Sequence, residues 1–267
     1  SKHLQGMNLD LTGKHAFVGG SSKGIGKAAA IELAALGAHV TLVSRSGEIM
    51  AEIIHKLDRS KGQAHDFMVA DFSNRPHLIS QVNALVSSRP VHILVNNTGG
   101  PPGGPITEAE PGAFEEAFHN HLLCNHQLAR AVMPEMIKAG FGRIINVIST
   151  SVKQPLPGLG VSNTIRAAVA SWAKTMANEL GQYGITVNNV LPGATSTDRL
   201  RSILESVAKK RGISIEQAAL NMQAEIPVGR FASPAEVGAA IAFLASPAAA
   251  SINGINLPVD GGRTKSL

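Results

Sequence analysis

A glycine-rich turn between an apolar run and an alanine-rich segment constrains this chain more than any other feature. The run at residues 15–18 predicts a buried strand, and residues 27–36 have the composition of a helix. Between them, Gly20 permits a tight turn, Gly24 lets the backbone approach a pyrophosphate, and Gly26 lets the helix pack close to the strand. The free N–H groups and positive dipole end of the helix then face the anion. This order predicts a phosphate-binding strand–turn–helix unit.

Strand-like and helix-like segments alternate along the chain without a break in composition. Strands are predicted at residues 15–19, 39–44, 64–70, 91–96, 142–148, 185–191 and 255–259. Helices are predicted at residues 24–36, 47–59, 76–87, 111–138, 159–181, 199–223 and 234–245. Such alternation is typical of a parallel sheet with helices on both faces. We therefore expect one α/β domain over residues 9–267, after a flexible or vector-derived segment at residues 1–8.

Composition argues against several classes of protein. Apolar residues make up 44% of the chain and charged residues 16%, as in an ordinary globular protein. Cys124 is the only cysteine, so we expect no disulfide, no metal site and a reducing, cytoplasmic location. We expect neither a membrane span nor a signal peptide. A net charge of +5 with one Trp and one Tyr does not favour nucleic-acid binding; it indicates a basic pocket for anionic ligands or a solvated basic surface.

A cluster of glycine and proline, GGPPGGP, occupies residues 99–105 after the predicted strand at 91–96. In an open parallel sheet, the loops at the carboxyl ends of the strands line the ligand crevice. We therefore expect this cluster to form a wall of the site rather than a linker between domains.

Five motifs in sequence order resemble those of the short-chain dehydrogenase/reductase family, and the resemblance extends from Leu9 to Gly262. They are the turn at residues 19–26 for the family's Thr-Gly-x-x-x-Gly-x-Gly, Asp71 after the third strand, Asn96-Asn97-Thr98-Gly99 for Asn-Asn-Ala-Gly, Pro192-Gly193 followed by Thr197, and Asp260-Gly261-Gly262. The resemblance implies a Rossmann-type, doubly wound sheet of seven parallel strands in the order 3-2-1-4-5-6-7, with three layers in a single domain.

The resemblance also implies a set of cofactor-binding residues: Gly20, Ser22, Lys23, Gly24, Ile25, Gly26, Ser44, Arg45, Asp71, Phe72, Asn97, Thr98, Gly99, Arg166, Pro192, Gly193, Thr195 and Thr197. An NAD site usually carries a carboxylate at the end of the second strand, but none occurs here before Glu48. Arg45 and Lys23 suit a 2′-phosphate, although two solvated surface cations are the alternative. We predict NADP(H) as the cofactor.

The catalytic residues depart from the family's pattern. In the family, a Ser, an Asn and a Tyr-x-x-x-Lys pair act together, with the Tyr as general acid/base. Asn146-Val147-Ile148-Ser149 matches the family's Asn-x-x-Ser, so Ser149 takes the position of the Ser. Ser162 replaces the Tyr, and Arg166 replaces the Lys.

These replacements remove the usual proton donor. A serine hydroxyl is a weaker acid than a phenol, and Ser162 is too short to reach the same point. Arg166 can grip ribose hydroxyls or stabilise an oxyanion, but it stays charged and cannot relay a proton. Lys153, after the fifth strand, is a candidate donor or a surface lysine. His121 falls at the family's Asn, in a register that Asn120 leaves open by one residue, and is a candidate donor or a structural side chain.

Two further segments carry expectations from the family. Residues 197–231 are expected to form a helical lid over the substrate, whose basic residues indicate an anionic substrate or a solvated face. The basic residues named here are Arg199, Arg201, Lys209, Lys210 and Arg211. The predicted helix at 159–181 is apolar over more than one stripe, and the family pairs it across a two-fold axis. We therefore expect a homodimer or a homotetramer.

The motifs and their departures leave three functions open. The retained cofactor motifs and Ser149 favour an NADP(H)-dependent oxidoreductase that reduces a carbonyl or oxidises an alcohol on a small substrate, with an altered proton donor. The loss of the Tyr and the Lys favours an NADP(H)-binding protein without redox chemistry, or a lyase or isomerase that retains NADP. None of the three involves a metal, a nucleic acid or a membrane.

Overall fold

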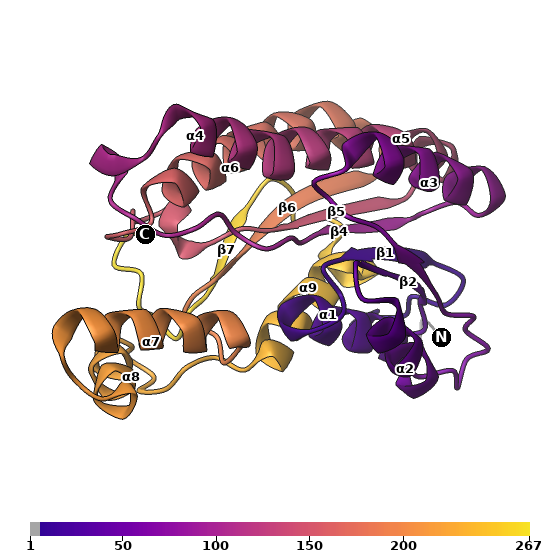
Figure 1. Cartoon of the computed structure of the whole chain (residues 1–267). Coiled ribbons are helices and arrows are strands. Elements are labelled where there is room, and N and C mark those ends of the chain that lie inside the picture. Colours follow the sequence, from indigo (N-terminus) through magenta and orange to yellow (C-terminus); the bar gives the residue numbers. More distant parts are fainter. Residues whose placement is uncertain (1–5) are drawn as a thin grey trace.

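A computed structural model describes residues 6–267, and most of the predicted terminal segment, residues 1–5, lies outside the described residues. The strands are β1 (His15–Gly19), β2 (His39–Ser44), β3 (Asp66–Val69), β4 (Ile93–Asn96), β5 (Gly142–Val147), β6 (Ile185–Pro192) and β7 (Asn256–Val259). They form one parallel sheet in the order β3-β2-β1-β4-β5-β6-β7 (Figure 1), which confirms the predicted fold class and strand order.

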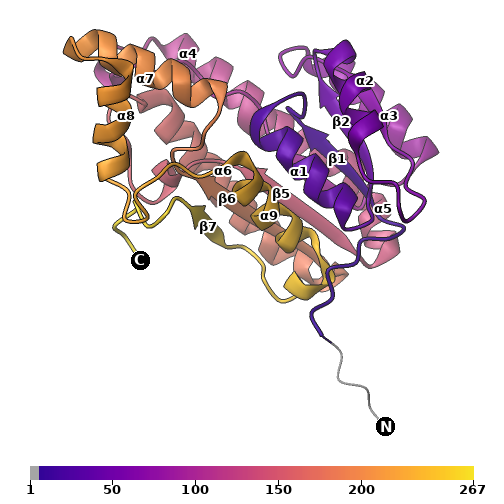
Figure 2. The same ribbon diagram turned by 90° about the horizontal axis from the view of Figure 1, so that it is seen from below.

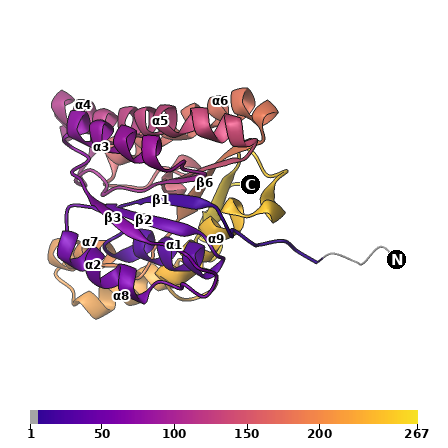
Figure 3. The ribbon, with the colours of Figure 1, turned by 90° about the vertical axis from the view of Figure 1, so that its right-hand side faces the viewer.

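Helices cover both faces of this sheet in three layers (Figure 3). One layer contains α1 (Gly24–Ala35), α2 (Gly47–Lys56) and α9 (Pro234–Ala245). The other contains α3 (Arg75–Ser88), α4 (Pro111–Ala117), α5 (Cys124–Ala139) and α6 (Gly160–Leu180). The last two helices, α7 (Asp198–Arg211) and α8 (Ile215–Ala224), stand off at one end of the molecule (Figure 2).

Each face of the sheet has its own apolar core, because strand side chains alternate between the two faces. Val18 and Val95 pack with α1 and α9 on one face. Phe17 and Leu94, their neighbours in the chain, pack with α3, α5 and α6 on the other face. The strands of the centre are buried on both sides, which accounts for the continuous apolar runs in the sequence.

Two predicted helices are interrupted. The segment predicted at 199–223 divides into α7 and α8, because Gly212 adopts a left-handed φ of 63° and Ser214 caps α8 by accepting a hydrogen bond from the Gln217 N–H. The segment predicted at 111–138 contains the wide π-turn η2 (Phe118–Leu123) between α4 and α5. A π-turn inserts an extra residue into the helical repeat and rotates the side chains that follow it.

The β1–α1 turn has the strained geometry that its glycines predicted. Gly20 and Gly24 adopt φ values of 58° and 57°, a region that residues with a Cβ rarely occupy. At Gly26, a Cβ would overlap the carbonyl oxygen of Gly20 and would lie 2.8 Å from the Nδ2 atom of Asn97. The first turn of α1 therefore lies directly against the phosphate turn and the end of β4.

Other short elements complete the chain: η1 (Ile106–Glu108), η3 (Thr150–Val152), η4 (Gly181–Tyr183) and η5 (Pro247–Ala249). Within residues 6–267, no helix combines the length and the apolar character that crossing a bilayer requires.

We expect Gly26→Ala to lower the free energy of unfolding by roughly 1–3 kcal/mol, because the new methyl group has no free space and its neighbours are backbone and a clamped amide. Urea denaturation measures this loss. Gly112→Ala in α4 is the matched control: nothing lies within 4 Å of its added Cβ, and alanine favours a helix. Equal losses in the two variants would contradict this account of the turn.

Candidate active site

The phosphate turn is clamped to the end of the neighbouring strand β4. Asn97 follows β4, and its Nδ2 atom donates hydrogen bonds to the carbonyl oxygens of Gly19 at 3.1 Å and of Gly20 at 3.4 Å. No side chain within residues 6–267 caps the N-terminus of α1, which leaves the N–H groups of its first turn for a ligand. Ser22 and Ile25 lie in the same turn, half-buried. The geometry is that of an anion site at a helix N-terminus.

The two cations predicted to bind a 2′-phosphate differ in their surroundings. Arg45 is exposed directly after β2 and makes no salt bridge within residues 6–267. Lys23 instead forms an ion pair with Asp198, at 3.2 Å, in the first turn of α7. Both side chains of that pair are exposed, so solvent weakens it and a phosphate could compete for the ammonium group. The structure makes Arg45 the principal candidate of the two.

Asp71 and Phe72 lie beside the turn, at the end of β3. The Oδ1 atom of Asp71 accepts hydrogen bonds from the N–H and the hydroxyl of Ser73, at 2.9 and 2.7 Å. These bonds lower the pKa of Asp71 and keep it ionised. The ring of Phe72 lies 3.2 Å from the position of a Cβ on Gly19, so it adds an apolar wall to the turn.

The segment after β6 reaches the turn from the other side. A Cβ on Gly193 would lie 2.6 Å from the Cβ of Asp260, which requires a glycine at this crossing. Thr195 donates a hydrogen bond to the carbonyl of Gly193 at 3.1 Å. Thr197 caps α7, and its methyl carbon lies 3.5 Å from the position of a Cβ on Gly24. The predicted cofactor motifs are therefore gathered at one edge of the sheet.

The predicted catalytic residues lie on the elements that follow β4 and β5. Ser149 comes directly after β5 and accepts a hydrogen bond from the Ser151 N–H at 3.1 Å. Arg166, on α6, donates from Nη1 to the carbonyl of Val147 at 3.3 Å. Its Nε atom is buried without a partner within residues 6–267. Ser162 is buried in the first turn of α6, where its hydroxyl makes no hydrogen bond to a residue in 6–267.

His121, and not Asn120, faces this cluster. The side chain of His121 is 3% exposed and its Nδ1 atom lies 3.0 Å from the Thr98 hydroxyl, after β4. Asn120 points to the outside and lines a cavity described below. The π-turn η2 carries both residues, and it sets which of them is turned inward. The alignment of His121 with the family's Asn stays a prediction.

The surroundings of His121 decide its charge state. Burial, and after it repulsion from Arg166 and Arg199, lowers the pKa of His121 to about 3. His121 is therefore neutral at neutral pH. A neutral imidazole can still pass on a proton by exchanging tautomers, with Thr98 as its neighbour.

Two arginines bring positive charge to the same region. Burial lowers the pKa of Arg166 to about 10, which leaves it charged at neutral pH. Arg199, in the first turn of α7, donates from its two Nη atoms to the carbonyls of Gly100 and Pro101, both at 3.4 Å. The glycine–proline cluster at 99–105 thus contacts the segment predicted as a lid. Lys153 lies half-buried at the end of η3.

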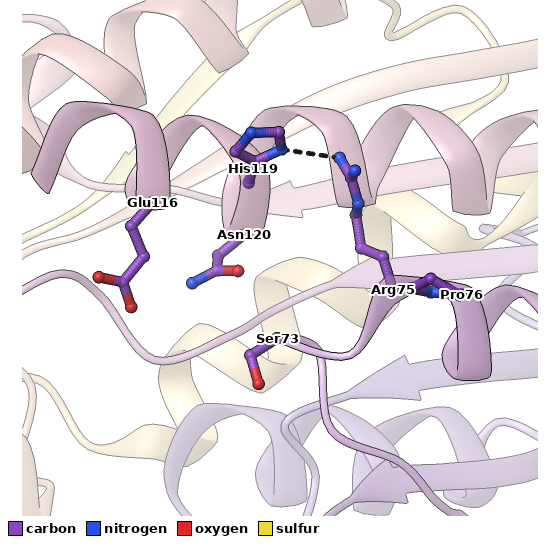
Figure 4. A pocket seen from close by; sticks show the side chains of 6 residues that line it. All are labelled: Ser73, Arg75, Pro76, Glu116, His119 and Asn120. Atoms are coloured by element: carbon purple, nitrogen blue, oxygen red, sulfur yellow. Dashed lines mark hydrogen bonds between the residues drawn. The ribbon is translucent and has the colours of Figure 1, made fainter. Parts of the chain in front are cut away.

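A cavity of about 320 Å³ lies beside the Asp71–Ser73 segment (Figure 4). Its lining residues are Ser73, Arg75, Pro76, Glu116, His119 and Asn120. Arg75 donates from Nη1 to the Nδ1 atom of His119 at 3.0 Å across it. None of the predicted catalytic residues lines this cavity. The sequence singled out neither His119 nor Arg75 as a site residue, because their contact joins residues that are 44 positions apart in the chain.

The sequence and fold match known proteins along nearly the whole chain. A family profile described as enoyl-(acyl carrier protein) reductase matches residues 20–264. The chain is 35% identical to the 3-oxoacyl-(acyl-carrier-protein) reductase of Vibrio cholerae over 260 residues, which cover 95% of this chain and 98% of that protein. It is 32% identical to the 7alpha-hydroxysteroid dehydrogenase of Escherichia coli K12 over 262 residues, which cover 97% and 98%.

The crystal structure of L-sorbose reductase from Gluconobacter frateurii, complexed with NADPH and L-sorbose, has the same fold. It superposes with a TM-score of 0.90 at 32% identity and covers 98% of this chain and 100% of that chain. The chain belongs to the short-chain dehydrogenase/reductase family, as its motifs indicated. The predicted class of oxidoreductase and the predicted cofactor, NADP(H), agree with the names of these relatives and with this neighbouring complex.

We expect acid to destabilise the protein partly through His121. The unfolded chain binds a proton there near pH 6.5, whereas the folded protein does so only near pH 3. Stability is therefore full above pH 6.5 and falls as the pH decreases towards 3. Between pH 6.5 and 5, His121 should account for about 2 kcal/mol of the loss. Urea denaturation of wild type and His121→Asn over this range tests it, and parallel profiles would refute it.

Proposed function

We propose that this protein is an NADP(H)-dependent oxidoreductase that reduces a carbonyl, or oxidises an alcohol, on a small substrate. The observation that supports the proposal is the placement of Ser149 just after β5 and of Arg166, on α6, against the end of the same strand. This strand lies beside β4, whose end is bonded to the phosphate turn through Asn97. The related L-sorbose reductase, with NADPH and a sugar, gives the proposal its chemical precedent. The altered residues, Ser162 and Arg166, change how the proton is supplied, while Ser149 keeps the position that would orient the substrate oxygen.

The residues of this chain fit NADP(H). A Cβ at Gly20 or Gly26 would collide with Asn97 or with the turn itself, so glycines are needed for the tight turn that would present its backbone to a pyrophosphate at the N-terminus of α1. Arg45 would hold the 2′-phosphate, and Asp71 would lie beside the adenine. Arg166, whose Nε atom has no hydrogen-bond partner within residues 6–267, would bind the hydroxyls of the nicotinamide ribose. When bound, NADPH supplies a hydride, and every other task falls to the protein.

In this mechanism, Ser149 orients the substrate oxygen by donating a hydrogen bond from its hydroxyl. Arg166 adds a positive field that stabilises the negative charge developing on that oxygen. The proton comes from Lys153, from a tautomer of His121 or from a bound water, with Ser162 at most a relay. Ser162 cannot replace a tyrosine, because the serine side chain is much shorter and its hydroxyl would not reach the point that a phenol hydroxyl reaches.

The lid and the assembly are parts of the same proposal. Residues 197–231 would cover the substrate, since Asp198 and Arg199 already join the start of α7 to the phosphate turn and to the 99–105 loop. A homodimer or homotetramer would bury the outer stripe of α6, where Ala167 is exposed and Trp172 is partly exposed.

One observation favours a second function, an NADP(H)-binding protein without redox chemistry or an NADP-retaining lyase or isomerase. The hydroxyl at the family's acid position, Ser162, makes no hydrogen bond within the described residues 6–267 to any group that would activate it. Steady oxidation of NADPH with a panel of aldehydes and ketones would support the oxidoreductase. Tight NADPH binding without consumption would support the second function.

We expect Arg45→Ala to reduce the preference for NADPH over NADH roughly 10- to 100-fold, because a charge-assisted phosphate bond is lost. Calorimetric titration with both nucleotides measures this ratio. Lys210→Ala, near the far end of α7, removes the same charge away from the site and should leave the ratio unchanged. An unaltered ratio in Arg45→Ala would show that the 2′-phosphate is bound elsewhere.

We expect Ser149→Ala to lower kcat by about 100- to 1000-fold and to leave the Kd for NADPH almost unchanged, because the hydroxyl contacts the reacting oxygen and not the cofactor. Ser162→Ala should change kcat little. Arg166→Ala should weaken NADPH binding as well as turnover. NADPH oxidation and calorimetry separate these effects. If Ser162→Ala were as damaging as Ser149→Ala, the serine itself would be the acid.

A further inference from the structure

Two guanidinium groups lie at the proposed substrate site without an acidic partner. Within residues 6–267, neither Arg166 nor Arg199 has a carboxylate within 4.0 Å, and each donates only to backbone carbonyls. The three bonds concerned are long, between 3.3 and 3.4 Å. Charged donors form bonds near 2.7–2.9 Å when they are fully engaged. The binding capacity of both groups is therefore largely unused.

The two arginines are held by neighbouring segments of the fold. Arg166 is attached to Val147 at the end of β5, and Arg199 is attached to the loop that follows β4. These strands are neighbours in register, with Asn96 opposite Asn146. Arg166 and Arg199 also repel each other and both repel a proton from His121, which agrees with their closeness. An anion between them would relieve this repulsion.

The remaining basic residues of α7 do not share this position. Arg201 forms an ion pair with Glu205 on the same helix, at 3.2 Å. The side chain of Arg201 is 79% exposed, and Lys209, Lys210 and Arg211 form the last turn of the helix. These four residues fit a solvated basic face, which was one of the two interpretations of the basic residues in this segment. Among the basic residues of α7, Arg199 is the one that bonds to the loop after β4.

We propose that the substrate carries a carboxylate and that Arg199 binds it, with Arg166 contributing positive field from the far side. The substrate class is then a small oxo acid, or the corresponding hydroxy acid. A planar carboxylate matches the fork of a guanidinium group, and a second cation nearby repays the cost of taking the anion out of water. This inference rests on the proposed oxidoreductase function and names the substrate of the same site.

The test compares acids with their neutral esters. The probes are 2-, 3- and 4-oxo acids of four to six carbons, each beside its methyl ester, with NADPH oxidation as the readout. For the preferred acid, we expect kcat/KM to exceed that of its ester in wild type. Arg199→Gln should lower the value for the acid roughly 10- to 100-fold, mainly through KM, and change the ester little. Arg201→Gln, the same substitution on the same helix, should leave both unchanged.

A binding measurement separates the two ideas. The same acids are titrated calorimetrically into the complex of the protein with NADP⁺, in wild type, Arg199→Gln and Arg201→Gln. One outcome is that wild type and Arg201→Gln bind the acid, Arg199→Gln does not, and no variant turns it over. That outcome supports this inference and contradicts the proposed function. Turnover of esters and other neutral carbonyls alone supports the function and overturns the inference. An equal loss of affinity for NADPH and for the acid in Arg199→Gln also overturns it, since Arg199 would then bind the cofactor.

Discussion

The close approach between the start of α1, the β1 turn and the end of β4 is the constraint on which the rest of the site depends. Side chains are excluded from Gly19, Gly20 and Gly26 because each would collide with Asn97 or with the turn itself. On its outer side, α1 is pressed against α9, where a Cβ on Gly238 would lie 2.8 Å from the backbone of Ala28. The phosphate turn therefore has almost no freedom to adjust to a ligand. A site with this rigidity binds a pyrophosphate without an ordering cost.

A ladder of buried amides carries this rigidity from the cofactor turn to the catalytic strands. Asn96 donates to Asn146 at 2.9 Å, Asn146 to Asn189 at 3.0 Å, and Asn189 to Asn256 at 2.8 Å, across β4, β5, β6 and β7. Buried amides are costly unless they are paired, and only one register of the four strands pairs these. The loops that carry Ser149 and the other site residues leave the sheet just beyond this ladder. The ladder therefore fixes the points at which these loops begin.

The sequence predicted the features that local chemistry controls, and it missed those that depend on tertiary contacts. Glycine positions and apolar periodicity predicted the β1–α1 turn, the alternation of strands and helices, and the end of the sheet at which the cofactor motifs gather. The family resemblance supplied the strand order. The break between α7 and α8 had signals in Gly212 and Ser214 that the periodicity overrode. The ion pair of Lys23 with Asp198 joins residues that are far apart in the chain, so no local sequence pattern predicts it. The inward turn of His121 depends on a π-turn that no residue in 118–123 specifies.

In the proposed mechanism, an arginine at the position predicted for the family's lysine changes what the site can do with charge. A lysine beside a tyrosine makes the phenol a better acid, so its positive charge acts through a proton. A guanidinium group beside Ser162 has no acid to influence, so its charge can act only on the substrate and the cofactor. Arg199 lies nearby and His121 is neutral, and no carboxylate within residues 6–267 lies at salt-bridge distance from either arginine, so positive potential gathers in this region. In the proposed reaction, such a field would stabilise an alkoxide before any proton arrives, and a weak or distant donor, even water, would then complete the reaction.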